Sequence, residues 1–246
     1  MSEIIETESV VLSKLAYGDS SIIADLFTED YGRISVIAKG GRSPKSKFGS
    51  LVDPLNHLQV VFYKKDSRDV QLLSSAEILT HFPSLKNDLQ KLKYAYAVIE
   101  LIKNLMAERE VNKQVFKGVV RILSRINSSN EKPDISFGRF FLFFLKEIGY
   151  EFQVERCAIC NGADFSSLSL YYNFDKGLIC GKCTKEAVDF YEINLELFQY
   201  LSCLKANISA DNYSDKTIDN ANSLLERHLK YHVPDFKGIQ SLQIVN

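Results

Sequence analysis

Two short stretches, Cys157-Ala158-Ile159-Cys160 and Cys180-Gly181-Lys182-Cys183, decide how the second half of this chain is organised. Nineteen residues separate the inner two cysteines, which is the spacing of a tetrahedral zinc site with four cysteine ligands. Each CxxC turn lets two thiolates reach one ion. Four protein ligands leave no coordination position for a reactive water, so we expect structural Zn2+ rather than catalytic zinc.

The segment between the two cysteine pairs has the pattern of a β-hairpin. Residues 171–174 and 178–179 favour strands, and residues 175–177 supply a turn between them. We therefore expect an inserted zinc ribbon over residues 154–186. Two disulfides or four free thiols are the alternatives. The acidic start, residues 1–6, lacks the apolar run of a signal peptide and favours a cytoplasmic location, where paired cysteines are more often metal ligands than cystines.

The composition is that of an ordinary globular protein. The chain has 246 residues, enough for two or three small domains, and a formal net charge of −1. The longest apolar run, residues 137–148, is too short to cross a bilayer and contains three charged residues. We therefore expect a soluble protein that does not associate with a membrane.

Positive charge is concentrated in one part of the sequence. Between Tyr31 and Arg68 there are eight basic and two acidic residues, a local surplus of six positive charges. Such a patch can hold a phosphate backbone even on a protein without net positive charge. The candidate nucleic-acid-binding residues are Arg33, Lys39, Arg42, Lys45, Lys47, Lys64, Lys65 and Arg68.

The first eighty residues are patterned as strands. Five short β-rich runs lie at residues 10–12, 22–27, 33–38, 57–63 and 70–73, and Asp30-Tyr31-Gly32 forms a hairpin turn between the second and the third. Five strands in a small unit predict a Greek-key barrel. The OB-fold is the commonest such barrel with a basic face, and an SH3-like barrel is the alternative.

From residue 83 the apolar period becomes helical. Amphipathic helices are expected over residues 85–106 and 115–126, and a third helix, over 137–148, is apolar nearly all round and therefore central. Residues 195–207 and 217–232 resume the helical pattern after the ribbon. The sequence thus predicts an α+β multidomain protein, with an OB-fold β-barrel at 1–80 and an α-helical domain at 81–246 that contains the inserted zinc ribbon with its four cysteine ligands.

Residues 39–48 combine four cations with two glycines directly after a strand. Glycines let the backbone approach a ligand closely, and cations spaced along a loop suit a phosphate track. A merely solvated basic loop is the alternative. The chain contains no P-loop, dinucleotide fingerprint, nucleophile elbow or convincing carboxylate pair, so we do not expect an enzyme. His228 and His232, four residues apart on a helix, are expected to be exposed.

Six segments occur in a specific order and spacing: residues 30–33 (DYGR), 38–42 (AKGGR), 51–55 (LVDPL), 137–140 (FGRF), 145–150 (LKEIGY) and 156–160 (RCAIC). Together they resemble the RecO family of bacterial recombination mediators over nearly the whole chain. The resemblance implies an N-terminal OB-fold, a helical domain and an embedded zinc ribbon.

The resemblance also implies function. Members of this family bind single- and double-stranded DNA, anneal complementary strands, and work with RecR to load recombinase onto strands coated by single-stranded DNA-binding protein (SSB), with RecF as a further partner. It implies that the basic loop holds DNA and that the protein is cytoplasmic and nucleoid-associated during repair. Arg139 is the candidate contact for the acidic, phenylalanine-ended SSB tail, because such a tail needs a cation beside an apolar pocket. A surface arginine that snorkels over the core is the alternative.

Two other functions fit the same features. An OB-type RNA-binding module with a zinc ribbon would prefer RNA over DNA of the same sequence, because it would contact the 2′-hydroxyl. A zinc-ribbon interaction module would leave the basic loop solvated. A zinc hydrolase is a more distant alternative, since it would need three protein ligands and a water on the ion.

Overall fold

The computed structural model describes residues 3–165, 169–184 and 190–243 of the chain. These residues form two compact units, one of residues 3–129 with 239–243 and one of the described residues between 130 and 238. The domain boundaries expected from the sequence, at residue 80 and around residues 154–186, stay predictions. Part of the expected ribbon, residues 166–168 and 185–186, lies outside the described residues.

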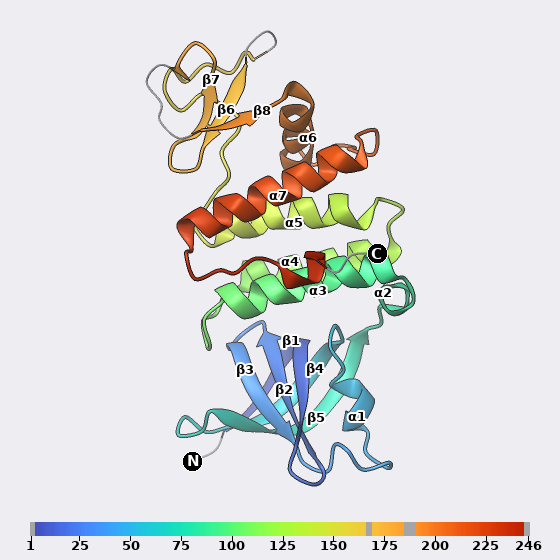
Figure 1. The fold of residues 1–246 in the computed structure, drawn as a ribbon. Coiled ribbons are helices and arrows are strands. Elements are labelled where there is room, and N and C mark those ends of the chain that lie inside the picture. The colour runs from blue at the N-terminus through green and yellow to red at the C-terminus, as the bar shows by residue number, and fades with distance from the viewer. Residues whose placement is uncertain (1–2, 166–168, 185–189, 244–246) are drawn as a thin grey trace. The chain divides into compact units, whose positions relative to one another are not determined.

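Five strands of the first unit close a barrel in the order β1-β2-β3-β5-β4 (Figure 1). All neighbouring pairs are antiparallel except β3 and β5, which are parallel. This topology confirms the expected OB-like fold. The strands are β1 (Glu3–Tyr17), β2 (Ser21–Thr28), β3 (Gly32–Ala38), β4 (His57–Lys64) and β5 (Val70–Thr80).

The first strand closes the barrel because it is long enough to pair on both sides. Its residues 9–17 pair with β2, and its residues 3–10 pair with β4. The sequence predicted only residues 10–12 of this strand, since three glutamates interrupt the apolar pattern before them. The side chains of Ile5 and Thr7 are nevertheless buried, because alternate strand positions face the barrel interior.

Helices complete the first unit. They are α1 (Phe48–Leu51), α2 (Pro83–Asn87), α3 (Leu89–Leu105), α4 (Lys113–Ser128) and the 3-10 helix Gln240–Gln243. The ring of Phe116, on α4, packs on Phe27 and His57 of the barrel with centroid distances of 5.8 and 6.2 Å. The carboxylate of Glu100, on α3, accepts hydrogen bonds from the backbone N–H groups of Gln240 and Ser241. Side-chain caps at Asp88 and Asn112 begin the two long helices.

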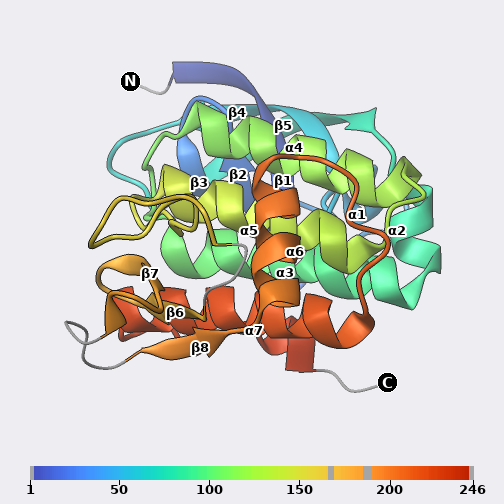
Figure 2. The ribbon, with the colours of Figure 1, turned by 90° about the horizontal axis from the view of Figure 1, so that it is seen from above.

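The described part of the second unit contains three α-helices and a small sheet with the strand order β7-β6-β8. Helix α6 runs across the direction of α5 and α7 (Figure 2), and each of the three contacts the other two. Three phenylalanines of α5 are fully buried, which confirms its expected central place within this unit. The elements are α5 (Pro133–Glu147), β6 (Leu170–Asn173), β7 (Gly177–Cys180), β8 (Tyr191–Ile193), α6 (Leu195–Lys205) and α7 (Asp215–His232). Among the described residues, none of the helices has the length and apolar character needed to cross a membrane.

The segment that joins α3 to α4, residues 106–112, is held against β3, and we call it the strap. The backbone N–H of Arg109 donates to the carbonyl oxygen of Arg33 at 2.9 Å. In return, the guanidinium of Arg33 donates to the carbonyl oxygens of Lys103 and Met106 at 2.6 and 2.7 Å. Gly32 makes this approach possible, because a β-carbon there would overlap the backbone of Glu110.

Replacing Gly32 by alanine should therefore destabilise the protein strongly. Gly32 and Gly18 both have positive φ angles, of 63° and 55°, but only Gly32 faces another backbone, whereas Gly18 faces open space. Gly18→Ala should cost about 1–2 kcal/mol for the backbone conformation alone, and Gly32→Ala roughly 3 kcal/mol or more. Urea unfolding of the two variants measures the difference. Equal losses of unfolding free energy would show that the strap does not lie against Gly32.

Candidate functional site

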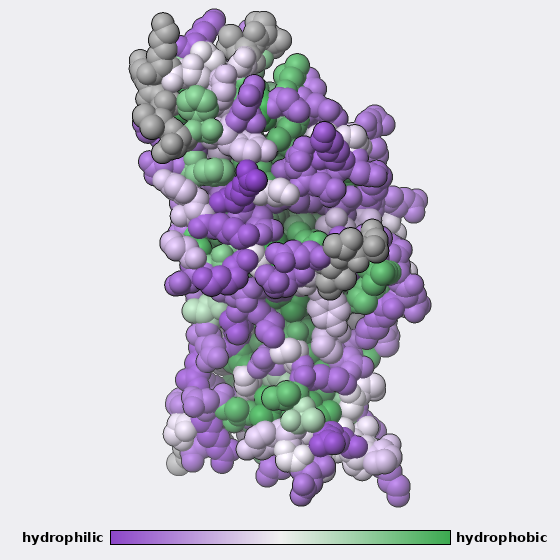
Figure 3. Space-filling view, viewed as in Figure 1, coloured by the Kyte–Doolittle hydropathy of each residue, from purple (hydrophilic) through white to green (hydrophobic). Residues whose placement is uncertain are grey.

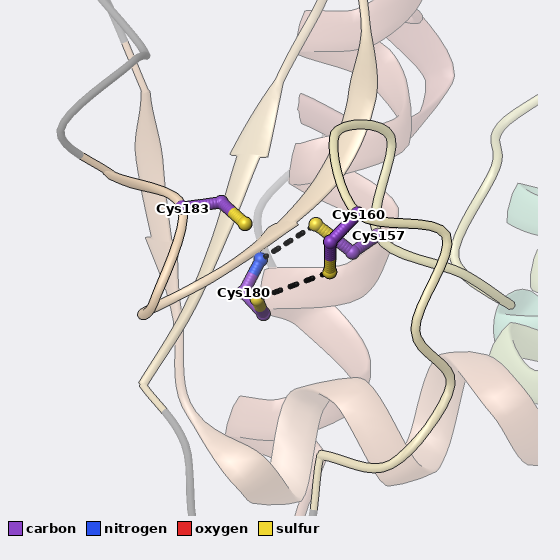
Figure 4. A group of neighbouring side chains, drawn as sticks. All are labelled: Cys157, Cys160, Cys180 and Cys183. Carbon is purple, nitrogen blue, oxygen red and sulfur yellow. Dashed lines mark hydrogen bonds between the residues drawn. The ribbon is translucent and has the colours of Figure 1, made fainter.

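The four cysteines of the two CxxC turns lie together in the second unit. Their sulfur atoms are all within 4.8 Å of one another, and Figure 4 shows the side chains of the two turns facing each other. The sulfur atoms of Cys160 and Cys180 are 3.8 Å apart. This distance is far longer than a disulfide bond of about 2.05 Å, and all four cysteines are free thiols.

Local backbone geometry brings the thiols together. In the first turn the N–H of Cys157 donates to Gly162 O at 2.8 Å, and in the second the N–H of Cys183 donates to Cys180 O at 2.8 Å. The hairpin between them has the expected turn, in which the side-chain oxygen of Asn173 accepts from the N–H groups of Asp175 and Lys176. Its strands pair Leu170 with Cys180, so the second cysteine pair begins where the sheet ends.

The thiols of this cluster differ in their pKa values. Burial by itself raises the pKa of the Cys157 thiol, but hydrogen bonds from backbone N–H groups, including that of Cys180, outweigh it and lower the pKa to about 6. Burial and then hydrogen bonding with the other three cysteines raise the pKa of Cys183 to about 12. One thiolate therefore forms readily, whereas the last proton leaves only if a cation offsets the accumulated negative charge. The cluster can hold a metal ion with all four sulfurs as ligands.

The basic loop, residues 39–48, lies on the surface of the barrel. The side chains of Lys39, Lys45 and Lys47 are exposed and line one open cavity of about 450 Å3 together with four serines of the loop and of β5. Arg42 is also exposed and donates to the carbonyl oxygen of Gly18 in the β1–β2 turn. Within the described residues, none of these four cations forms an ion pair.

The other predicted nucleic-acid-binding residues are not part of this cavity. Lys65 and Arg68 are exposed in the β4–β5 hairpin, where Lys64 pairs with Asp66 at 3.3 Å. Arg33 is different, since its guanidinium binds the carbonyl oxygens at the end of α3. The structure thus gives Arg33 a role in holding the strap, and its assignment to nucleic-acid binding stays a prediction.

An apolar row crosses the outside of the barrel. Figure 3 shows apolar side chains on the outer surface of this unit. Leu15 of β1 is 67% exposed. Strand register places six outward-facing apolar residues side by side across all five strands. In order around the barrel they are Leu15, Ile23, Ile37, Leu72, Tyr63 and Ile4. This row was not predicted from the sequence, although consecutive apolar residues in β2 and β3 are its signal.

Arg139 is engaged within the second unit. Only 8% of its side chain is exposed, and it forms an ion pair of 3.1 Å with Glu131. Its Nη1 donates to the carbonyl oxygens of Cys203 and Leu204 at the end of α6, both at 3.2 Å, and its Nη2 donates to that of Ile208 just beyond the helix. This arrangement neutralises the negative end of the helix dipole. Contact with an SSB tail stays a prediction for Arg139, and the observed contacts give it a structural role.

The expectation that His228 is exposed was wrong. His228 is only 2% exposed, and its ring packs edge-on beside the stacked rings of Phe152 and Tyr172, in an aromatic cluster that joins the hairpin to α7. Its Nε2 is 3.0 Å from Tyr150 O. The signal was present in the sequence, because His228 continues the apolar period of α7 through Ile218, Ala221 and Leu225.

An OB-like barrel followed by a helical unit with a four-cysteine cluster defines a multidomain protein of the α+β class. A family model described as "Recombination protein O N terminal" matches residues 1–82, and one described as "Recombination protein O C terminal" matches residues 86–238. The chain belongs to the recombination protein O family. The resemblance seen in the sequence is thereby confirmed.

Several relatives carry the name "DNA repair protein RecO". The chain is 34% identical to the one from Chlorobium limicola over 154 residues, which cover 63% of this chain and 59% of that protein. It is 40% identical to the one from Salinibacter ruber over 124 residues, which span only 48% of that protein. The protein from Chloroherpeton thalassium is 28% identical over 98% of this chain and 97% of its own length.

Burial of His228 should make the stability of the protein depend on pH. Burial first, and then the nearby His232, lower the pKa of His228 to about 4. The unfolded chain binds the proton near pH 6.5, so the unfolding free energy should fall as the pH drops from about 6.5 to about 4, by up to about 3 kcal/mol. Denaturant unfolding at several pH values measures this loss.

His228→Gln should remove that component, because the amide can still donate to Tyr150 O but does not titrate. His81→Gln, at an exposed position, is the matched control and should keep the pH dependence of the native protein. If the His228→Gln variant lost stability between pH 7 and pH 4 as steeply as the control, burial of a neutral His228 would be refuted.

Proposed function

We propose that this protein is a DNA repair and recombination mediator without enzymatic activity. It binds single- and double-stranded DNA, anneals complementary strands, and works with RecR and RecF to load recombinase onto DNA coated by SSB. Membership of the recombination protein O family supports this proposal. The observation that carries it is the loop of four exposed cations on an OB-like barrel, none of them ion-paired among the described residues.

The loop suits a phosphate backbone for two physical reasons. Its cations are solvent-exposed and form no ion pair with the described carboxylates, so DNA phosphates would not have to displace a carboxylate from them. Three of them share one cavity with several serine hydroxyls, which can donate hydrogen bonds to phosphate oxygens. Two strands held on one basic surface repel each other less and meet at a higher effective concentration, and annealing follows.

A specific observation also favours the alternative function, that of an interaction module. Ile4 and Leu15, the two ends of the apolar row, are about two-thirds exposed (66% and 67%), and the four residues between them are half-buried, although aliphatic side chains gain free energy by leaving water. Exposed apolar patches of this kind mark protein–protein contacts. In a mediator the two functions coexist, and we place the contact with a protein partner such as RecR on this row.

We further propose that the cysteine cluster holds a structural Zn2+ ion. A tetrahedral ion with bonds of about 2.3 Å to sulfur requires neighbouring sulfurs about 3.8 Å apart. The sulfur atoms of Cys160 and Cys180 are 3.8 Å apart and all four sulfurs lie within 4.8 Å of one another, so a small contraction of the cluster gives this geometry. Four thiolates fill the coordination sphere, and the ion would staple the hairpin to the loop that precedes it.

Removing the four cations of the loop should weaken DNA binding and its dependence on salt. Each phosphate contact to single-stranded DNA contributes about 0.7 to the slope of log affinity against log salt concentration, so the Lys39/Arg42/Lys45/Lys47→Ala variant should lose a slope of up to about 3. Fluorescence anisotropy of a labelled strand at several salt concentrations measures both quantities.

A second quadruple variant is the matched control. Lys146, Lys176, Lys216 and Lys237 are exposed lysines of the second unit, and their replacement by alanine changes the net charge by the same amount. This control should keep the native affinity and slope. Equal losses in the two variants would mean that binding follows net charge alone, and no binding by the native protein at low salt would refute the proposal.

A further inference from the structure

A cavity of about 270 Å3 lies in the first unit, where the strap runs beside the barrel. We call it the strap pocket. Tyr31 and Phe62 of the barrel form one side, and Arg109 and Val111 of the strap form the other. Pockets for drug-sized ligands are roughly 300–1,000 Å3, so this one suits a ligand no larger than a nucleoside.

The walls of the strap pocket are apolar and include an aromatic ring. The rings of Tyr31 and Phe62 meet edge to face at 5.8 Å, which fixes the orientation of the tyrosine. Ile34 contributes to the same side, and Val111, which is 49% exposed, contributes to the side of the strap. A half-exposed valine beside an ordered tyrosine offers two surfaces between which a flat ring can lie.

The rim carries both cations and hydrogen-bond acceptors. The ammonium of Lys64 lies 5.7 Å from the centre of the Tyr31 ring, and it also pairs with Asp66, whose side chain is almost fully exposed. The guanidinium of Arg109 donates to Arg68 O at 3.1 Å. An exposed ion pair contributes little stability, so these charged groups can exchange their present partners for a ligand at small cost.

The backbone of the pocket is held firmly on both sides. Hydrogen bonds between Arg33 and the strap fix Arg109, whose φ angle of 63° is unusual for a residue other than glycine. On the barrel side, the N–H of Tyr31 donates to the hydroxyl of Thr28 at 3.0 Å. A preformed site of this kind loses little conformational entropy when a ligand binds.

We propose that the strap pocket receives one unpaired base of single-stranded DNA, an inference that rests on the DNA binding proposed above. The base would lie against the Tyr31 ring with its polar edge toward the carboxylate of Asp66 and the cation of Arg109. The adjoining phosphates would meet the exposed Lys65 and Arg68. A base within a duplex is stacked on both faces and cannot enter such a pocket without unpairing, so the pocket gives the barrel a preference for single strands.

The absence of tryptophan from the sequence makes a direct test possible. The chain contains no tryptophan, so Tyr31→Trp introduces a single fluorescent reporter and keeps an aromatic ring in the pocket. A deoxyadenosine strand of about 12 nucleotides, within the site size of one OB-fold, should quench its fluorescence. An abasic strand of equal length and charge should bind about tenfold more weakly, because it lacks the stacking contribution. Tyr96→Trp, on α3 and outside the pocket lining, is the matched reporter and should not respond.

Substitutions at Val111 test the site in a second way. In the Tyr31→Trp background, Val111→Glu places a carboxylate at the mouth and should abolish the quenching, whereas Val111→Thr keeps size and shape and should retain it. Fluorescence anisotropy of a labelled strand, measured with the same proteins, shows whether the strand still binds when the quenching is lost. Strand binding without quenching would overturn the strap pocket and leave the proposed function standing, whereas absence of both signals would overturn both. Quenching by deoxyadenosine monophosphate at concentrations as low as those needed for the strand would show a free-nucleotide site and also overturn the inference.

Discussion

Four thiol groups that can share one cation are the constraint on which the second unit depends. The strands of its sheet are only three or four residues long, and strands this short are not stable by themselves. Two attachments hold the hairpin in place. One is the cysteine cluster, which joins the end of β7 to the loop before β6, and the other is the aromatic cluster around His228, which joins β6 to α7. A metal ion would convert four separate thiols into one cross-link without requiring an oxidising compartment.

The first unit depends on a different constraint, the closure of its barrel. Because β1 pairs with both β2 and β4, the sheet closes into a barrel without a free edge between these strands. The outer surface of the barrel is then available for ligands. Three features then share the outside of one small barrel: the basic loop, the apolar row and the strap pocket. Their chemistry differs, and we assign them to phosphates, a protein partner and one base. A mediator has to bind strand and protein together, and a barrel with three distinct surfaces can do so.

Much of this architecture could be predicted from the sequence because it depends on local patterns. Cysteine spacing indicated the cluster, and helical periodicity located the long helices. β-rich runs bounded by turn residues located β2, β3 and β4 to within one residue at each end, but only the first four residues of β5. The length of β1 could not be predicted, because its acidic half becomes a strand only by pairing with β4, far along the chain. The strap depends in the same way on a contact between Gly32 and Glu110.

The contacts that individual charged residues make could not be predicted from the sequence either. Arg33 and Arg139 look like surface cations, yet each binds carbonyl oxygens at the end of a helix, and only the fold brings those carbonyls within reach. The apolar row is formed by residues from five strands whose register no local pattern specifies. His228 is the exception, since continuing the apolar period of α7 by one more turn would have placed it inside.

Zinc content measures the central structural claim most directly. The protein, purified under reducing conditions and treated with a mild chelator, should carry one zinc ion per chain by elemental analysis. Cys157→Ser should lose the ion and unfold at a lower temperature, because it removes one ligand of the cluster. Cys203→Ser, which alters the one cysteine outside the cluster and can keep its contact with the Tyr213 hydroxyl, should retain both the ion and the stability. A native protein without metal, or a Cys157→Ser variant that kept its zinc and its thermal stability, would contradict the account.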